Sequence, residues 1–230
     1  MADKKKKQEV RSIYKILAVI GCVLFVVLMI VSSMGSSWIT SFKAVQPGDA
    51  VTIDYTIRDR TGNPLVSSDR TVVNSVVSAG SGIFISRPLQ ILANQSSTTA
   101  VVPITVQYYP STETRILPFA LFGGEHDAIS SALVGMKVNE QKTITIPFTS
   151  SMTQFWSAAQ LMNQGTNVSD IHIGDKLSLA VSNSEVLSKN ATESSYSTRI
   201  GEVTQKSAAG ITLDFGYPTI EIKVVSIGGS

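Results

Sequence analysis

The stretch Phe119–Pro147, FALFGGEHDAISSALVGMKVNEQKTITIP, predicts a glycine turn, a short helix, a second turn and a strand. Gly123 and Gly124 permit a tight backbone approach. The apolar residues that follow share one helical face, at the spacing of Ala128, Ile129, Ala132 and Leu133. Residues 141–146 alternate polar and apolar side chains, the period of a half-buried strand. A helix this short buries too little apolar surface to be stable alone, so we expect it to lie against a sheet.

Strand patterns dominate most of the remaining sequence. Val51–Ile57 alternates most clearly, and Thr219–Ile227 is the last candidate strand. Further strands are predicted at Val101–Tyr109, Thr114–Phe119, Thr198–Val203 and Gly210–Phe215, and a turn followed by a strand is predicted at Val168–Val181. Ser68–Leu117 is expected to form one or two β-hairpins, Phe155–Met162 a short amphipathic helix, and Asn183–Ser197 a loop.

The N-terminal segment combines a basic tail with an apolar run. Residues 1–15 carry a net charge of +4, so the remaining residues carry −2 and present no basic patch for nucleic acid. Residues 16–42 contain no charged side chain. This pattern predicts a transmembrane signal anchor at 16–39 in contact with the lipid bilayer, with a cytoplasmic N-terminus and an extracytoplasmic C-terminal domain. A cleaved signal peptide is the alternative, with Ser33–Ser36 as the cleavage site.

Several motifs resemble the FKBP-type peptidyl-prolyl cis-trans isomerases. GDAVTIDYTIRDRTGNPL at 48–65 is similar to the first strand of that family, and ALVGMKVNEQKTITIP at 132–147 is similar to the segment that follows its active-site loop. IHIGDKLSL at 171–179 and RIGEVTQKSAAGITLDF at 199–215 resemble the domain that the SlyD-like branch carries in its flap. The resemblance covers about residues 46–68 and 119–228.

The resemblance implies an α+β fold, an antiparallel half-barrel around a short helix. The half-barrel is expected at 40–149 and 216–230, with an extra β insertion at 68–117, and the inserted flap domain at 150–215. The family pocket maps onto six apolar positions, which are Tyr55, Leu65, Phe119, Ile129, Met152 and Ile220. At the rim, Val66 replaces an aspartate and Glu125-His126 replaces an apolar pair, while Met152 stands in place of the flap tyrosine. His126 is either a polar rim group or an exposed residue at a helix N-terminus.

The chemistry that the resemblance implies is rotation about an X-Pro bond, which has a barrier of about 20 kcal/mol. A water-poor pocket that favours the twisted amide suffices, without a nucleophile, a metal or a cofactor. The sequence agrees with this, since it has two histidines and one cysteine, Cys22, and shows no metal-ligand cluster or phosphate loop. The expected partners are unfolded or proline-containing exported polypeptides.

Other segments suggest binding roles. Phe155, Trp156, Leu161 and Met162 form either the small core of the inserted domain or a chaperone surface for unfolded chains. Asn94, Asn167 and Asn190 match the N-glycosylation sequon. The sequence therefore predicts a membrane-anchored prolyl isomerase and chaperone. The alternatives are a non-catalytic chaperone or binding module on the same fold, and a subunit of a membrane or cell-surface complex that docks through residues 68–117.

Overall fold

The structure is a computed structural model that describes residues 19–30, 32, 43–111, 116–147, 152–163, 165–182 and 196–228. The chain divides into two compact units, Met1–Lys43 and Ala44–Ser230. The predicted basic tail at 1–15, the sequon residue Asn190 and most of the predicted loop Asn183–Ser197 lie outside the described residues.

The first unit corrects the predicted membrane anchor. Residues 19–30 are helical. Along the ranges that the structure describes, no helix has both the length and the hydropathy that crossing a bilayer requires. The transmembrane anchor predicted at 16–39 was therefore wrong, and so was the single-pass localisation that depended on it.

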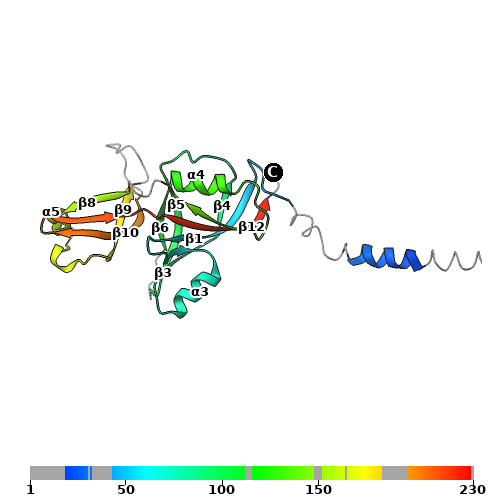
Figure 1. The fold of residues 1–230 in the computed structure, drawn as a ribbon, viewed down its shortest axis with the longest axis horizontal. Helices are drawn as coiled ribbons and strands as arrows, with labels where there is room; N and C mark the ends of the chain where they lie inside the picture. The colour runs from blue at the N-terminus through cyan, green and yellow to red at the C-terminus, as the bar shows by residue number, and fades with distance from the viewer. Residues whose placement is uncertain are drawn as a thin grey trace, which may run out of the picture. The chain divides into compact units, whose positions relative to one another are not determined.

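The second unit is mostly β, as Figure 1 shows. Its first half contains β1 (Ala50–Arg58), β2 (Pro64–Ser67), α3 (Arg70–Ser78), β3 (Ile83–Ser86), β4 (Leu89–Leu92), β5 (Val101–Tyr109), β6 (Ile116–Phe122) and α4 (Gly123–Ala132). Its second half contains β7 (Gln141–Thr145), β8 (Thr153–Ser157), α5 (Ala158–Asn163), the 3-10 turn η2 (Val168–Asp170), β9 (Lys176–Ser182), β10 (Tyr196–Ser207), β11 (Gly210–Asp214) and β12 (Thr219–Gly228).

The strands form one sheet that curls into a half-barrel. Its order is β7-β12-β1-β2-β3-β5-β6-β10-β11-β8, with β4 paired to β1 and β9 paired to β10. The described helices of this unit are short, at nine, ten and six residues. The predicted α+β class was therefore wrong, because the hydrogen-bonded sheet supplies most of the regular structure and the helices only cover parts of it.

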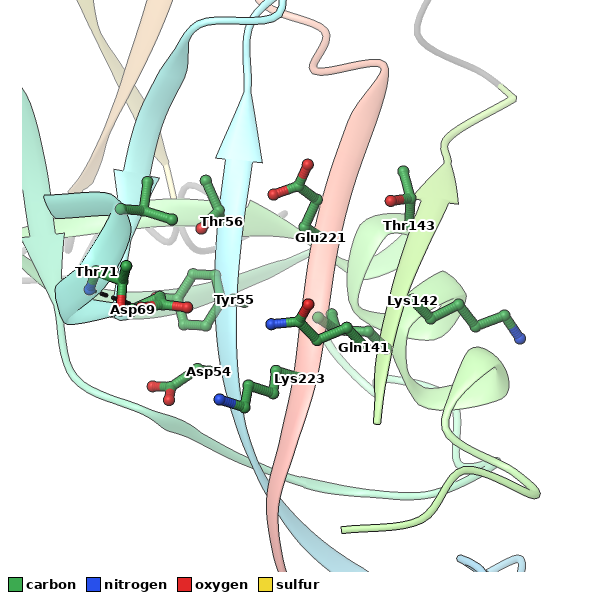
Figure 2. A pocket seen from close by; sticks show the side chains of 12 residues that line it. Asp54, Tyr55, Thr56, Asp69, Thr71, Gln141, Lys142, Thr143, Glu221 and Lys223 are labelled. Carbon is green, nitrogen blue, oxygen red and sulfur yellow. Dashed lines mark hydrogen bonds between the residues drawn. The ribbon is translucent and has the colours of Figure 1, made fainter. Parts of the chain in front are cut away.

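The two faces of the sheet formed by β7, β12 and β1 differ in polarity, as the alternation of polar and apolar residues along these strands predicts. Asp54, Thr56, Glu221 and Lys223 lie together on the outer face, where they line an open cleft of about 440 Å³ (Figure 2). The register places Asp54 opposite Lys223 and Thr56 opposite Glu221. Mixed charge on a strand face that water reaches is the usual solvated side of an antiparallel sheet.

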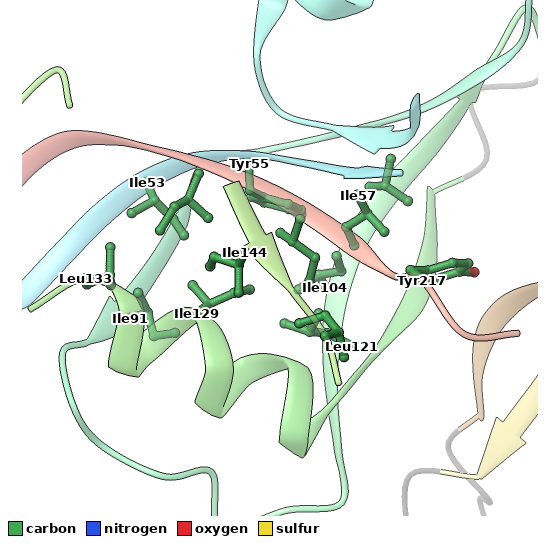
Figure 3. Close-up of a cluster of buried hydrophobic side chains, with 14 of the residues drawn as sticks. Ile53, Tyr55, Ile57, Ile91, Ile104, Leu121, Ile129, Leu133, Ile144 and Tyr217 are labelled. Carbon is green, nitrogen blue, oxygen red and sulfur yellow. The ribbon is translucent and has the colours of Figure 1, made fainter. Parts of the chain in front are cut away.

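The inner face of the same strands packs against α4. Ile53, Tyr55 and Ile57 of β1 belong to one buried cluster with Ile129 of α4 and with Leu133, the residue that follows the helix (Figure 3). The helix begins at Gly123, so the two glycines that were predicted to form a turn are its first residues, and a Cβ at position 123 would lie 2.7 Å from the carbonyl oxygen of Thr99. The prediction of a short helix against a sheet is confirmed for α4.

The predicted hairpins of Ser68–Leu117 are only partly confirmed, because the region also contains α3. Asp69 caps this helix, since its carboxylate accepts a hydrogen bond from the backbone N–H of Thr71 at 2.7 Å. The sequence of the helix, RTVVNSVVS, is rich in β-branched valine and in serine, which favour strands and turns over helices. The sequence pattern therefore did not predict this helix. Its N-terminal cap and its contacts with β2 and β3 stabilise it.

Residues 152–215, here called the inserted segment, have a separate small core. It consists of Leu161, Ile171, Leu179, Val203, Ile211 and Leu213. The segment enters and leaves the half-barrel at one place, because the backbone N–H of Phe215 donates to the carbonyl of Met152 at 3.0 Å. Thr198 of β10 bridges Phe119 of β6, so the sheet continues from the half-barrel into the segment.

The helix predicted at Phe155–Met162 was wrong in its first half. Thr153–Ser157 is strand β8, paired residue by residue with β11, and the helix α5 begins only at Ala158. The mixed apolar spacing of this stretch does not separate strand from helix, and pairing with β11 decides the outcome. The other predicted strands correspond to β1, β5, β6, β9, β10, β11 and β12, within a few residues at each end.

Candidate functional site

Five of the six predicted pocket residues belong to the main core. Tyr55, Leu65, Phe119, Ile129 and Ile220 are buried in one cluster between the sheet and α4, and Phe119, Ile129 and Ile220 are fully buried. Met152, the sixth residue, is half-buried just before β8 and is not part of this cluster. The structure therefore brings most of the predicted pocket together, but as packed side chains.

The predicted rim residues are also largely enclosed. Val66 is buried on β2 and Glu125 is fully buried in the first turn of α4. His126 is half-buried, with its Nδ1 3.2 Å from Oδ1 of Asp127. Glu125 accepts a hydrogen bond from the backbone N–H of Phe122 at 2.9 Å, so it caps the helix that carries it.

Glu125 binds an arginine that the sequence prediction did not single out. Arg199 of β10 donates to Oε1 of Glu125 at 2.6 Å and to Oε2 at 2.8 Å, and both side chains are fully buried. The guanidinium also donates to the carbonyl of Ala120 at 2.8 Å and twice to that of Phe215, at 2.8 and 3.0 Å. Every donor of the arginine is therefore satisfied, and this buried pair joins the inserted segment to α4.

Aromatic rings complete the enclosure of Arg199. Its Cζ lies 3.8 Å from the ring centre of Tyr217 and 4.3 Å from that of Phe122. Tyr217 in turn stacks on Phe119, with ring centres 6.1 Å apart. The Tyr217 hydroxyl donates to the carbonyl of Ile200 and accepts from its N–H. Arg199 and Tyr217 thus occupy the space next to Phe119, on the side where the inserted segment meets the half-barrel.

Little free volume remains beside these side chains. The cleft that Leu65, Ile200 and Tyr217 help to line measures about 10 Å³. A volume of that size admits about one water, and it is far smaller than the cavity of about 150 Å³ that is known to bind benzene. A proline ring therefore does not fit in this cleft, which Tyr217 helps to close.

The sequence gives little indication that Arg199 and Tyr217 are buried at this site. The sequence around Arg199 contains the polar residues Thr198 and Glu202, so its pattern predicts that the arginine faces solvent. The missing information is the partner, since Glu125 lies 74 residues away in sequence. The one available hint is Glu125 itself, a charged residue at a position where the resemblance calls for an apolar side chain.

Two more ion pairs attach the inserted segment to the β1–β2 turn. Lys176 lies 2.6 Å from Asp59, and Arg60 lies 2.5 Å from Asp214. Burial alone raises the pKa of Asp59, but the Lys176 ammonium, the Thr61 hydroxyl and the Asn63 N–H together hold that pKa below its ordinary value of 3.8. With the Arg199–Glu125 pair, the segment is held to the half-barrel by charge at three places.

The lowered pKa of Asp59 predicts acid sensitivity. A depressed folded-state pKa contributes stability that is fully present above the unfolded value, about pH 4, and is lost as the pH falls through the folded-state pKa. Asp59→Asn should therefore cost free energy of unfolding at neutral pH, and this cost should shrink below about pH 4. Urea titrations at several pH values test this. A cost that does not change with pH contradicts the assignment.

Burial raises the pKa of both Tyr55 and Tyr217 to about 12. A raised folded-state pKa contributes stability that is present below the unfolded value of 10 and is lost as the pH rises toward 12. At about pH 11 the phenolate absorbance of the folded protein should therefore fall short of that of the unfolded chain. In Tyr217→Phe the shortfall should be about half as large, and an unchanged shortfall contradicts the assignment.

The four residues of the predicted chaperone surface do not form one surface. Leu161 is buried in the core of the inserted segment, and Trp156 packs partly against that core. Phe155 and Met162 are exposed, at 53% and 66%. Phe155 lies on the opposite face of β8 from Trp156, because successive side chains of a strand alternate. The core interpretation therefore holds for Leu161 and Trp156, and a chaperone role for Phe155 and Met162 stays a prediction.

The sequon residues Asn94 and Asn167 are both exposed. Asn94 adopts a left-handed backbone with φ of 56° in the turn after β4. Asn167 accepts a hydrogen bond from the N–H of Ser169. Their glycosylation stays a prediction.

Comparison of the chain with known protein families and with curated proteins found no match. The resemblance to FKBP-type isomerases therefore depends on the motifs of this sequence alone.

Proposed function

We propose that the chain is a polypeptide-binding module on a half-barrel scaffold and that it does not catalyse prolyl isomerisation. The observation that carries the proposal is the filled space beside Phe119, where Arg199 and Tyr217 are both bonded in place. Catalysis of isomerisation requires a hollow that favours the twisted amide over the planar one. A hollow closed by a satisfied, buried ion pair offers no such preference.

The binding role is supported by exposed apolar side chains on the inserted segment. Phe155, Met162 and Ile173 are more than half exposed, at 53%, 66% and 66%. Exposed aromatic and methionine side chains adapt to varied apolar partners. The three ion pairs hold the segment that presents them, so little ordering entropy is lost there on binding.

A prolyl isomerisation assay on the full-length chain tests the catalytic part of the proposal. We expect no acceleration of cis/trans exchange in a proline-containing peptide. Acceleration that is lost in Ile129→Ala, with the fold retained by circular dichroism, contradicts the proposal and supports the isomerase that the resemblance implies.

An aggregation assay tests the binding part. The full-length protein should suppress the aggregation of a chemically unfolded client, and the double variant Phe155→Ser, Met162→Ser should lose most of that effect. The matched control is Ile116→Ser, Val134→Ser, two exposed apolar residues of the half-barrel, which should retain it. Equal loss in both double variants contradicts the assignment to the inserted segment.

A further inference from the structure

Strand β8 is a terminal strand of the sheet, and one of its two edges has no partner strand in the part of the chain that the structure describes. On its other side β8 pairs with β11 from Thr153 to Ser157, and the strand order ends there. The backbone N–H and C=O groups along such an edge are a template for pairing with a further strand. Unlike an apolar face, the edge therefore specifies the backbone geometry of whatever covers it.

The hydrogen bonds that frame the β8–β11 pair show which residues of β8 face β11. The N–H of Phe215 donates to the carbonyl of Met152, and the N–H of Ala158 donates to that of Ala209. In an antiparallel pair such bonds recur at every second residue. The even-numbered residues between 152 and 158 therefore direct their backbone groups toward β11.

The odd-numbered residues Thr153, Phe155 and Ser157 consequently direct their backbone groups to the open edge. The Ser157 N–H agrees with this orientation, because it donates to the side chain of Gln160 at 2.9 Å and not to β11. The groups that remain for a further strand are the N–H groups of Thr153 and Phe155 and the carbonyls of all three residues. This set is centred on Phe155.

The edge of β8 lacks the charge that usually protects terminal strands. The strand reads TQFWS, and residues 143–169 contain no charged side chain. By contrast β7 and β9, which also have a single partner strand, carry Lys142 and Lys176. Lysine on an edge strand is a common device against edge-to-edge pairing. Nothing of this kind opposes pairing along β8.

The sequence of β8 is also complementary to itself. When two copies lie antiparallel with Phe155 opposite Phe155, Thr153 of one copy lies opposite Ser157 of the other. Aromatic pairs and pairs of hydroxyl residues are favourable cross-strand neighbours. The backbone groups match in the same register, because the two Phe155 residues exchange both N–H···O bonds and each Thr153 N–H donates to the Ser157 carbonyl of the other copy. A strand of unrelated sequence satisfies the backbone without these side-chain pairs.

We infer that two copies of this chain pair along β8, antiparallel and centred on Phe155, so that their sheets join. Phe155 is 53% exposed, and its ring lies over Gly210, where a Cβ would be 2.9 Å from Cζ of the ring. Pairing places the two rings side by side on one face of the joined sheet, where they form a larger apolar patch. A single strand pair is a small interface, so the association is weak and concentration-dependent.

Disulfide crosslinking of the full-length chain tests the pairing. Cys22 is the only cysteine of the sequence, so each variant is made in a Cys22→Ser background. Cα atoms of a hydrogen-bonded antiparallel pair lie about 5.5 Å apart, within the span of about 4.4–6.8 Å that a disulfide bridges. Under a copper–phenanthroline oxidant, Phe155→Cys should form the crosslinked dimer at least about ten-fold faster than Ile173→Cys. Ile173 is the matched control, because it is an apolar residue of the same segment, 66% exposed, that precedes β9.

A mixture of two variants tests the register. Thr153→Cys and Ser157→Cys should each crosslink slowly alone, because neither position lies opposite itself. An equal mixture of the two should crosslink at least about five-fold faster than either one, since the inferred register places these positions opposite each other.

A proline at position 155 tests the role of the backbone. Phe155→Pro removes the outward N–H and leaves the bonds to β11, so the edge strand tolerates it. Added to both members of the mixture, it should slow crosslinking at least about ten-fold, whereas Phe155→Thr, which keeps the N–H, should slow it less than about three-fold. Circular dichroism checks that both variants are folded.

The inference is overturned if Phe155→Cys crosslinks no faster than Ile173→Cys, if the mixture crosslinks no faster than its members, or if proline and threonine at position 155 act alike. It goes beyond the proposed function, and the two fail separately. Absence of the crosslink with aggregation suppression intact contradicts only the pairing. A chain that crosslinks at position 155 and does not suppress aggregation contradicts only the proposed function.

Discussion

Replacement of Arg199 by alanine is expected to lower the free energy of unfolding by about 3–5 kcal/mol, because it leaves the Glu125 carboxylate buried without its counter-ion. The loss is large since both side chains are fully buried and hydrogen-bonded to each other twice. Loss of the guanidinium also removes the hydrogen bonds that it donates to the carbonyls of Ala120 and Phe215. Equilibrium denaturation in urea, followed by circular dichroism, gives the magnitude.

The double variant Arg199→Met, Glu125→Leu separates the charge from the packing. Replacing both members of a buried ion pair by apolar residues is often near neutral. We therefore expect the double variant to recover more than about half of the stability lost in Arg199→Ala, although the carbonyls stay without a donor. A double variant as unstable as the single one means that packing and carbonyl contacts dominate. A loss below about 1 kcal/mol in Arg199→Ala contradicts the role assigned to the pair.

Phe119→Ala is expected to cost about 3–5 kcal/mol, the usual range for truncating a fully buried aromatic residue. Phe119 is fully buried and lies between the rings of Phe84 and Tyr217, with centre distances of 6.3 and 6.1 Å. Removing its ring leaves a cavity beside Tyr217, and the strands on either side relax only partly into it. Urea denaturation again provides the measurement.

Phe155→Ala is the matched control, since it makes the same chemical change at an exposed position. Phe155 is 53% exposed on β8, so we expect its truncation to change stability by less than about 0.5 kcal/mol. Similar losses at the two positions contradict the core assignment of Phe119. A loss of stability in Phe119→Ala but not in Phe155→Ala shows that the packing of Phe119 against Tyr217 stabilises the fold.

The elements that could be predicted from sequence are those in which local pattern and tertiary environment agree. Strict alternation in β1 and β12 places Tyr55 and Ile220 on the buried face. The spacing of Ile129 and Leu133 places both against that face from α4. These residues need no knowledge of a distant partner, because burial of one face is sufficient to specify them.

The failures share a different cause, which is dependence on a partner far away in sequence. Strand β8 forms because it pairs with β11, and α3 forms because a cap and a neighbouring sheet outweigh the weak helix propensity of valine and serine. Arg199 is buried because Glu125 meets it. The apolar run near the N-terminus predicted a membrane span from composition, but the described residues contain no helix that could cross a bilayer.

The adjacent ends of the inserted segment give the chain the topology of a cassette. Since Phe215 hydrogen-bonds to Met152, a two- or three-residue turn has the reach to replace everything between them. The buried ion pair opposes such an excision. Removing β10 also removes Arg199, and the Glu125 carboxylate then stays buried in the half-barrel without a counter-ion. Excision, or transplantation into another half-barrel, therefore requires a compensating change at position 125, and an ancestor without the segment is expected to carry an uncharged residue there.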